Sequence, residues 1–144
     1  MDKKFEARIK YIAINEEGKE EKRNDKVLVE GLLFSEIEEK ISKWAFSNIK
    51  GNYMITEIKL SQISEVIPDV KNEYFDHYWY IGKVKTIFID ETTGREKKSI
   101  INLLVETESV NEAYALLWNY IEEFIFLRTE IISVSLSQFV DIIE

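Results

Sequence analysis

The chain is built from two copies of one sequence unit. Residues 8–16 match residues 83–91 at an offset of 75, and beyond the following turn the offset becomes 76. At that second offset two tripeptides recur unchanged: Leu-Val-Glu at 28–30 and 104–106, and Leu-Ser-Gln at 60–62 and 136–138. A register that holds from the first strand-like segment to the last residues indicates an internal repeat. The fold must therefore accommodate two closely similar units.

The residue pattern of each copy predicts two strands, a helix and a third strand, in that order. The first two strand-like segments flank a short turn that contains Gly18 in one copy and Gly94 in the other, which is typical of a β-hairpin. Helix starts are predicted at Ser35 and Ser109, because each is followed three residues later by Glu, as in a capping box. A third strand is expected near residues 53–60 and again near residues 130–136.

The alternation of the first strands predicts which face meets the helices. The face that would be covered carries Phe5, Ala7 and Ile9 in one copy and Tyr80, Gly82 and Val84 in the other. Two helices can cover only one face of a six-stranded sheet. We therefore predict an α+β fold of tandem duplicated β-β-α-β units. Its sheet would be rich in antiparallel pairs, with both helices on one face, pseudo-twofold halves and the strand order 2-1-3 in each half.

The domain organisation follows from the repeat. We expect a single domain, 1–144, with a first β-β-α-β unit at 1–67, a linker at 68–77 and a second unit at 78–144. The linker contains Pro68, the only proline, beside several polar residues. Formal charge differs between the copies: residues 1–68 carry a net −1 and residues 69–144 a net −7, within a total of −8.

Composition excludes several kinds of chemistry. The chain has no cysteine and one histidine, His77, which rules out disulfides, thiol catalysis and histidine-rich metal sites. No catalytic motif or phosphate-binding glycine loop occurs, so we expect no enzymatic activity, no cofactor and no metal. Acidic residues near the hairpin turns are expected to be solvated turn charges. No apolar run approaches the ~18 residues of a membrane span, so a cytoplasmic protein without membrane contact is expected.

A basic strand pair is repeated on the sheet face that the helices leave uncovered. It defines a candidate nucleic-acid or ligand face: Lys4, Arg8, Lys10, Trp79, Lys83 and Lys85. Cationic sheets that carry an aromatic residue can hold phosphates and stack bases. The net charge favours a plainer interpretation, in which these cations pair with carboxylates on neighbouring strands: Glu6, Glu30, Glu57 and Glu106.

An aromatic run next to the linker is a candidate junction pocket. It comprises Tyr74, Phe75, His77 and Tyr78. Such a run can line a ligand pocket in which His77 titrates. The alternative, which we favour, is a structural seam between the two halves, because one imidazole without a partner is weak evidence for a site.

The second predicted helix is far more apolar than the first. Its main stripe is formed by Ala113, Tyr114, Leu117, Ile121 and Phe124. Further apolar residues widen that stripe and define a candidate interaction surface: Leu116, Trp118, Tyr120, Phe126 and Leu127. This arc is either an exposed recognition or homodimer surface or a centrally packed helix face.

Several segments resemble a known family. They are residues 5–11, 17–19, 34–36, 55–59, 63–67 and 79–85, which cover nearly the whole chain in order. The family is the domain of unknown function 4494, found in Bacteroidetes and their phages. The resemblance implies an intracellular bacterial or phage protein and transfers no catalytic residue.

Two functions remain open from the sequence. The first is a non-enzymatic binding or adaptor protein that acts on a protein partner, or as a homodimer, through the junction of the halves or the second helix. The alternative is nucleic-acid or nucleotide binding on the basic sheet face.

Overall fold

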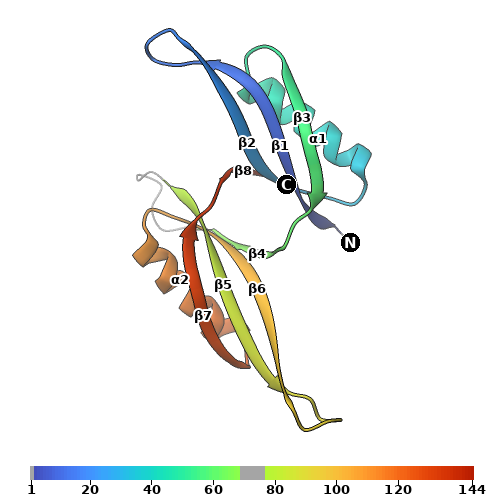
Figure 1. Ribbon diagram of the computed structural model, residues 1–144, viewed down its shortest axis with the longest axis vertical. Coiled ribbons are helices and arrows are strands. Elements are labelled where there is room, and N and C mark those ends of the chain that lie inside the picture. Colours follow the sequence, from blue (N-terminus) through green and yellow to red (C-terminus); the bar gives the residue numbers. More distant parts are fainter. Residues whose placement is uncertain (1, 69–76) are drawn as a thin grey trace. The chain divides into compact units, whose positions relative to one another are not determined.

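Figure 1 shows a computed structural model of the chain, which describes residues 2–68 and 77–144. The elements in chain order are β1 (Lys3–Ile14), β2 (Glu20–Gly31), α1 (Phe34–Asn48), β3 (Tyr53–Leu60), β4 (Ile63–Ile67), β5 (Tyr78–Ile89), β6 (Glu96–Thr107), α2 (Val110–Phe124), β7 (Arg128–Leu136) and β8 (Phe139–Ile143). The α+β class and the duplicated β-β-α-β order are confirmed. Within these residues no helix is long and apolar enough to cross a membrane.

The strands form two four-stranded sheets, in the orders β3-β1-β2-β8 and β4-β6-β5-β7. The predicted order 2-1-3 is confirmed in each copy, with antiparallel pairing of all three strands. The prediction of a single six-stranded sheet is wrong. Each copy has an additional five-residue strand, β4 or β8, which extends a three-stranded sheet at the β2 or β6 edge.

The two short strands are exchanged between the copies. β4 pairs in parallel with β6 of the second copy, and β8 pairs in parallel with β2 of the first (Figure 1). The compact units are therefore residues 1–61 with 138–144, here called unit 1, and residues 62–137, called unit 2. The chain passes from one unit to the other within the two identical Leu-Ser-Gln tripeptides.

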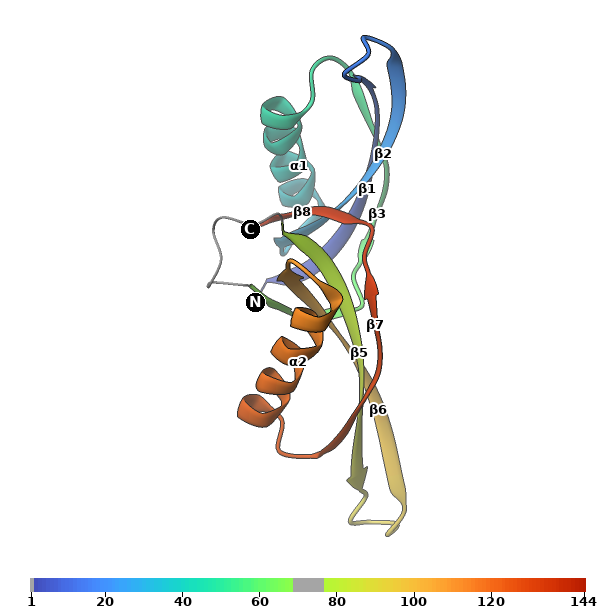
Figure 2. The same ribbon diagram turned by 90° about the vertical axis from the view of Figure 1, so that its left-hand side faces the viewer.

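In each unit one helix lies against one face of its own sheet (Figure 2). The core of unit 1 is formed by Phe5, Ala7, Ile9, Val27, Val29, Ile37, Ile41, Ala45 and Ile49. The core of unit 2 is formed by Val84, Leu103, Val105, Ala113, Leu117 and Ile121. The strand alternation therefore identified the covered face correctly.

The two helices begin differently. Ser109 is the N-cap of α2, and its side chain accepts a hydrogen bond from the Glu112 N–H at 3.2 Å, as predicted. The predicted Ser35 cap is wrong: α1 begins at Phe34, after Leu33, which provides no side-chain cap. Phe34 and Val110 are equivalent positions of the repeat, so both helices start at the same place and Ser35 lies inside the first turn of α1. Glu36 Oε2 accepts the Leu32 N–H instead, at 3.1 Å.

Candidate functional site

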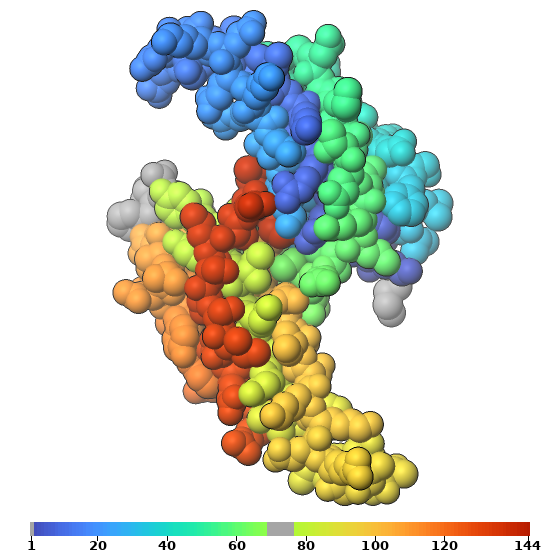
Figure 3. All heavy atoms as spheres, in the orientation of Figure 1, coloured from blue at the N-terminus to red at the C-terminus, as the bar shows by residue number. Residues whose placement is uncertain are grey.

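Helix α2 and the turn after it expose large apolar side chains at the surface of unit 2 (Figure 3, orange). We call the following set the α2 aromatic surface: Tyr114, Trp118, Phe124, Phe126 and Leu127. Phe126 is 88% exposed and Phe124 is 59% exposed. The rings of Tyr114 and Trp118 are in edge contact, with their centroids 6.4 Å apart. One turn separates these two residues on the helix, so they lie on the same flank.

The first copy shows that the fold does not require these aromatic residues. α1 and α2 have the same length and bury the same positions: Ile37, Ile41 and Ala45 in α1, and Ala113, Leu117 and Ile121 in α2. At the positions equivalent to the α2 aromatic surface the first copy carries Glu38, Ser42, Asn48, Lys50 and Gly51. Five exposed positions that are polar or glycine in one copy are therefore aromatic or leucine in the other.

The charge around this surface also differs between the copies. Residues 108–127 contain no lysine or arginine and four carboxylates: Glu108, Glu112, Glu122 and Glu123. The equivalent residues 32–51 contain three glutamates and three lysines. The stretch that carries the α2 aromatic surface therefore has a net charge of −4, whereas the equivalent stretch of the first copy is neutral.

Three of the five residues predicted for the interaction surface belong to the α2 aromatic surface. Trp118, Phe126 and Leu127 are exposed, but Leu116 and Tyr120 are half-buried and pack against the core of unit 2. Burial, together with the nearby carboxylate of Glu65, raises the pKa of the Tyr120 hydroxyl. Leu116 and Tyr120 are four residues apart, on the flank of α2 opposite Trp118.

Two members of the surface had been assigned to the core stripe, Tyr114 and Phe124. Their direction on the helix is consistent with that prediction, but they are 45% and 59% exposed. Helical periodicity predicts the direction of a side chain, whereas the extent of the sheet beneath it decides whether it is covered. The sequence signal for both residues is that the first copy carries polar residues, Glu38 and Asn48, at the equivalent positions.

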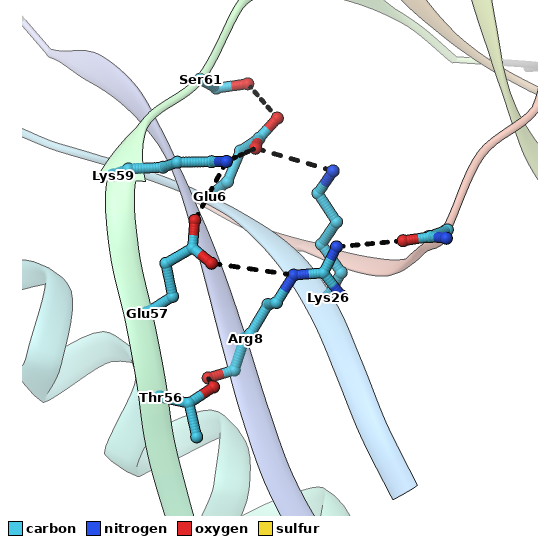
Figure 4. Close-up of polar contacts among 8 residues, drawn as sticks. Glu6, Arg8, Lys26, Thr56, Glu57, Lys59 and Ser61 are labelled. Carbon is cyan, nitrogen blue, oxygen red and sulfur yellow. Dashed lines mark hydrogen bonds and ion pairs between the residues drawn. The ribbon is translucent and has the colours of Figure 1, made fainter.

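Two of the basic-face residues of unit 1, Arg8 and Lys4, lie close to carboxylates, and Figure 4 draws the contacts of Arg8. Arg8 Nε lies 3.9 Å from Glu57 Oε2, and the Arg8 guanidinium also donates to Gln138 Oε1 at 3.1 Å. Lys4 Nζ lies 3.9 Å from Glu30 Oε1. These contacts are the strand-to-strand pairs expected from the plainer interpretation of the basic face.

The same face of unit 1 contains two further lysines that share its carboxylates. Lys26 Nζ lies 3.6 Å from Glu6 Oε2, and Lys59 Nζ lies 3.0 Å from Glu57 Oε1 (Figure 4). The Lys59 ammonium lowers the pKa of the Glu57 carboxyl, and Glu57 raises the pKa of Lys59. The side chains of Lys59 and Glu57 are 59% and 39% exposed, so this pair neutralises charge more than it adds stability, whereas Lys26 and Glu6 are only 17% and 13% exposed.

Three further basic-face residues, Trp79, Lys83 and Lys85, lie on β5 in the sheet of unit 2. Lys85 Nζ is 2.9 Å from Glu130 Oε2 and lowers the pKa of that carboxyl. Lys83 is exposed, whereas Trp79 is half-buried and its backbone oxygen accepts the Ser137 N–H at 2.7 Å. Glu106 pairs with His77 instead of with a lysine.

Lys10 is the predicted basic-face residue that lies beside a hollow of unit 1. The hollow has a volume of about 1260 Å³ and lies between the β1–β2 hairpin and the segment that joins α1 to β3. Lys10, Lys22 and Lys50 line it together with Glu20. Tyr11 also lines it and donates to Asp25 Oδ2 at 2.6 Å; burial and this carboxylate raise the pKa of its hydroxyl.

Two of the four junction-pocket residues, Tyr74 and Phe75, lie outside the described residues. His77 Nδ1 is 2.8 Å from Glu106 Oε1, within unit 2. Tyr78 begins β5 and is 47% exposed. The structure therefore gives His77 a carboxylate neighbour that the sequence analysis did not assign to it.

Asp90, at the second hairpin turn, has local partners. Asp90 Oδ2 is 2.8 Å from Lys97 Nζ, and Asp90 Oδ1 accepts the Thr92 N–H at 2.8 Å. These two contacts lower the pKa of the Asp90 carboxyl. Among residues 2–68 and 77–144, no three His, Cys, Asp or Glu side chains are grouped so that they could hold a metal ion.

The fold and the site together define a class: an α+β protein of two related units, one of which carries an exposed aromatic and acidic helix surface. The chain belongs to the family described as Domain of unknown function (DUF4494), whose model matches residues 3–144. The resemblance noted in the sequence is thereby confirmed. No curated protein and no solved structure matches the chain.

Proposed function

We propose that the protein binds a partner protein through the α2 aromatic surface and acts as a non-enzymatic binding or adaptor protein inside a bacterial or phage-infected cell. One observation carries the proposal. Five exposed positions that α1 and its following turn fill with polar residues or glycine are aromatic or leucine in the second copy. Since the fold is the same in both copies, folding does not account for this difference.

The composition of the surface suits protein recognition. Tryptophan and tyrosine are enriched among the residues that dominate binding energy at interfaces. Removing apolar surface from water contributes ~25 cal/mol per Å², so the exposed rings of Trp118 and Phe126 are costly to leave in solvent and favourable to cover. The four glutamates nearby favour a partner that places lysine or arginine beside its apolar anchors.

The test is a selection of short peptides on the full chain. A random-peptide display library is selected against the wild-type protein, and the enriched peptides are titrated by fluorescence anisotropy. The double variant Trp118→Ser/Phe126→Lys installs the residues that the first copy carries at these positions. We expect this variant to weaken binding at least about tenfold, which corresponds to ~1.4 kcal/mol. We expect enriched peptides to combine aromatic or aliphatic residues with lysine or arginine.

The matched control is Phe46→Ala, because Phe46 is 89% exposed on α1 of the other unit. This variant should bind the selected peptides as the wild type does. All variants should retain the wild-type circular dichroism and melting temperature, since the altered side chains are exposed. Enrichment of the same peptides on the wild type and on the double variant would contradict the proposal. A concentration-dependent dimer that the double variant abolishes would instead make a second copy the partner.

The alternative of nucleic-acid binding rests on one specific observation, the three lysines that line the hollow of unit 1. Against it, Lys4, Arg8 and Lys85 are each within 4.0 Å of a carboxylate. A labelled single-stranded oligonucleotide is therefore included in the same titrations. Salt-sensitive binding that survives in the α2 double variant and is lost in Lys10→Glu/Lys22→Glu would support the alternative.

A further inference from the structure

Strand β7 forms an edge of the unit 2 sheet. Within the part of the chain that the structure describes, β7 pairs only with β5. The Ser137 N–H donates to the Trp79 oxygen at 2.7 Å, which marks these two residues as a hydrogen-bonded pair. In an antiparallel ladder hydrogen-bonded and non-hydrogen-bonded pairs alternate. The backbone N–H and C=O of Leu136 and Val134 are therefore directed away from β5, toward the free edge.

This edge lacks the charges that usually protect exposed strands. Residues 131–136 read Ile-Ile-Ser-Val-Ser-Leu, and Ile132 and Leu136 are 48% and 64% exposed. The only charged residues of β7, Arg128 and Glu130, belong to its first three positions. Exposed edges without charge or proline readily pair with another strand.

The equivalent edge of unit 1, strand β3, carries charged side chains that disfavour pairing with another strand. β3 carries Glu57 and Lys59 at the positions where β7 carries Ser133 and Ser135. Lys59 Nζ lies 3.0 Å from Glu57 Oε1, so β3 presents an ion pair along its length. The unit whose edge strand lacks both charges is also the unit that carries the α2 aromatic surface.

The flank of α2 that carries Trp118 faces this open edge. In unit 1 the Tyr53 hydroxyl, at the start of β3, donates to Ser42 Oγ on α1 at 3.2 Å. Ser42 is the repeat equivalent of Trp118, and β3 is the equivalent of β7. α2 also packs against β7 directly, and Figure 3 shows their atoms side by side at the surface of unit 2.

We propose that the partner binds as an extended segment that adds a fifth strand to the unit 2 sheet along β7. The inference rests on the proposed function, because it describes how the partner meets the same surface. Backbone groups of the segment pair with those of Val134 and Leu136, and its apolar side chains pack on the Tyr114–Trp118 ring pair. Its lysine or arginine side chains lie near Glu122, which is one turn from Trp118 on α2. Strand addition of this kind obtains affinity from the main chain and specificity from side-chain contacts.

The test uses the full chain and the highest-affinity peptide selected on it. Leu136→Pro removes a backbone N–H that points to the free edge, at a position where an edge strand tolerates proline. The matched control is Leu60→Pro in β3: the Ser61 N–H donates to the Lys4 oxygen at 2.9 Å, so Leu60 holds the same position and is 58% exposed. We expect Leu136→Pro to weaken peptide binding about tenfold or more, and Leu60→Pro to change it by less than about twofold.

A second measurement leaves the protein unchanged, in case Leu136→Pro does not fold. The peptide is N-methylated on alternate backbone nitrogens in two complementary sets. Pairing along one edge predicts that one set abolishes binding and the other preserves it, because successive amides of a strand point to opposite sides. Bound peptide should also slow hydrogen exchange of the Val134 and Leu136 amides.

The outcomes separate the two proposals. Binding that needs Trp118 and Phe126 but tolerates both N-methylated sets and Leu136→Pro would overturn strand addition and leave the proposed function standing. Failure of any peptide to bind in an α2-dependent manner would overturn both. A concentration-dependent dimer of the free chain that Leu136→Pro abolishes would place a second copy of β7 at this edge and overturn the assignment to a foreign segment.

Discussion

At the scale of single residues, the two copies fill equivalent but separate cores with different side chains. Ala7 in β1 and Gly82 in β5 occupy equivalent repeat positions; Ala7 belongs to the core that includes Ile41 of α1, and Gly82 lies against Leu117 of α2. A Cβ atom built on Gly82 would lie 2.5 Å from Leu117 Cδ1 and 2.7 Å from Cδ2. Gly82 is therefore required by the close approach of Leu117, and its φ angle is not in the left-handed region.

We predict that Gly82→Ala lowers the free energy of unfolding by ~1–3 kcal/mol, because an added methyl group overpacks a filled core. Urea-induced unfolding followed by circular dichroism measures the change. In the background Leu117→Ala the same substitution should cost much less, since the clashing atoms are absent and the two sites are coupled. An unchanged unfolding midpoint in Gly82→Ala would mean that the sheet and α2 adjust freely at this contact.

At Gly82 the sequence predicts which face of the strand is covered, but not that the position requires glycine. Strand alternation correctly placed Gly82 on the covered face, together with Tyr80 and Val84. The requirement for glycine there depends on the rotamer of Leu117, a residue far along the chain. Similarly, the ion pairs of Arg8 and Lys4 followed from strand adjacency, whereas the pairing of Glu106 with His77 depended on where the chain enters β5.

At the scale of elements, local signals predicted the hairpins and helices but not the short strands. β4 and β8 are five residues long and follow directly on β3 and β7 after the Leu-Ser-Gln tripeptides, with no glycine or proline to mark a turn. Which edge such a strand joins is decided by non-local pairing, so the sequence pattern could not reveal it. The β2-β1-β3 order, by contrast, follows from a hairpin and one helical connection.

The different starts of the two helices yield a prediction. Ser109→Ala removes the hydrogen bond from the Glu112 N–H and should cost ~1 kcal/mol of stability. Ser35→Ala should cost almost nothing, because Ser35 lies within the first turn of α1 and alanine is the better helix former. Thermal or urea unfolding of the two variants measures the difference. Equal losses would imply that Ser35 caps α1 in solution.

At the scale of the whole molecule, each unit depends on a strand from the other copy. In unit 1, Phe139 of β8 is 5% exposed and Lys26 Nζ lies 4.5 Å from the centre of its ring. The Trp44 indole N–H donates to Asp141 Oδ2 at 2.8 Å, which connects α1 to β8. In unit 2, Ile63 of β4 is 7% exposed at the equivalent position.

We predict that Phe139→Ala destabilises unit 1 by ~3–5 kcal/mol, the usual cost of truncating a buried phenylalanine. Hydrogen exchange resolved by residue is the measurement: amides of β2 should lose protection before those of β6. The matched variant Ile63→Ala should cost ~2–5 kcal/mol and reverse that order, exposing β6 first. If Phe139→Ala loosened β6 as readily as β2, the assignment of β8 to the unit 1 sheet would be wrong.

The exchange at the Leu-Ser-Gln tripeptides has an evolutionary consequence. If a chain consisted of one repeat, the short strand that leaves its own sheet could complete the sheet of a second identical chain, so that two chains would complete each other by reciprocal donation. Joining the two repeats in one gene makes that assembly independent of concentration. It also allows the two copies to differ in sequence, so that one carries Tyr114 and Trp118 where the other carries Glu38 and Ser42. The single polypeptide thus contains two different units, each of which completes the sheet of the other.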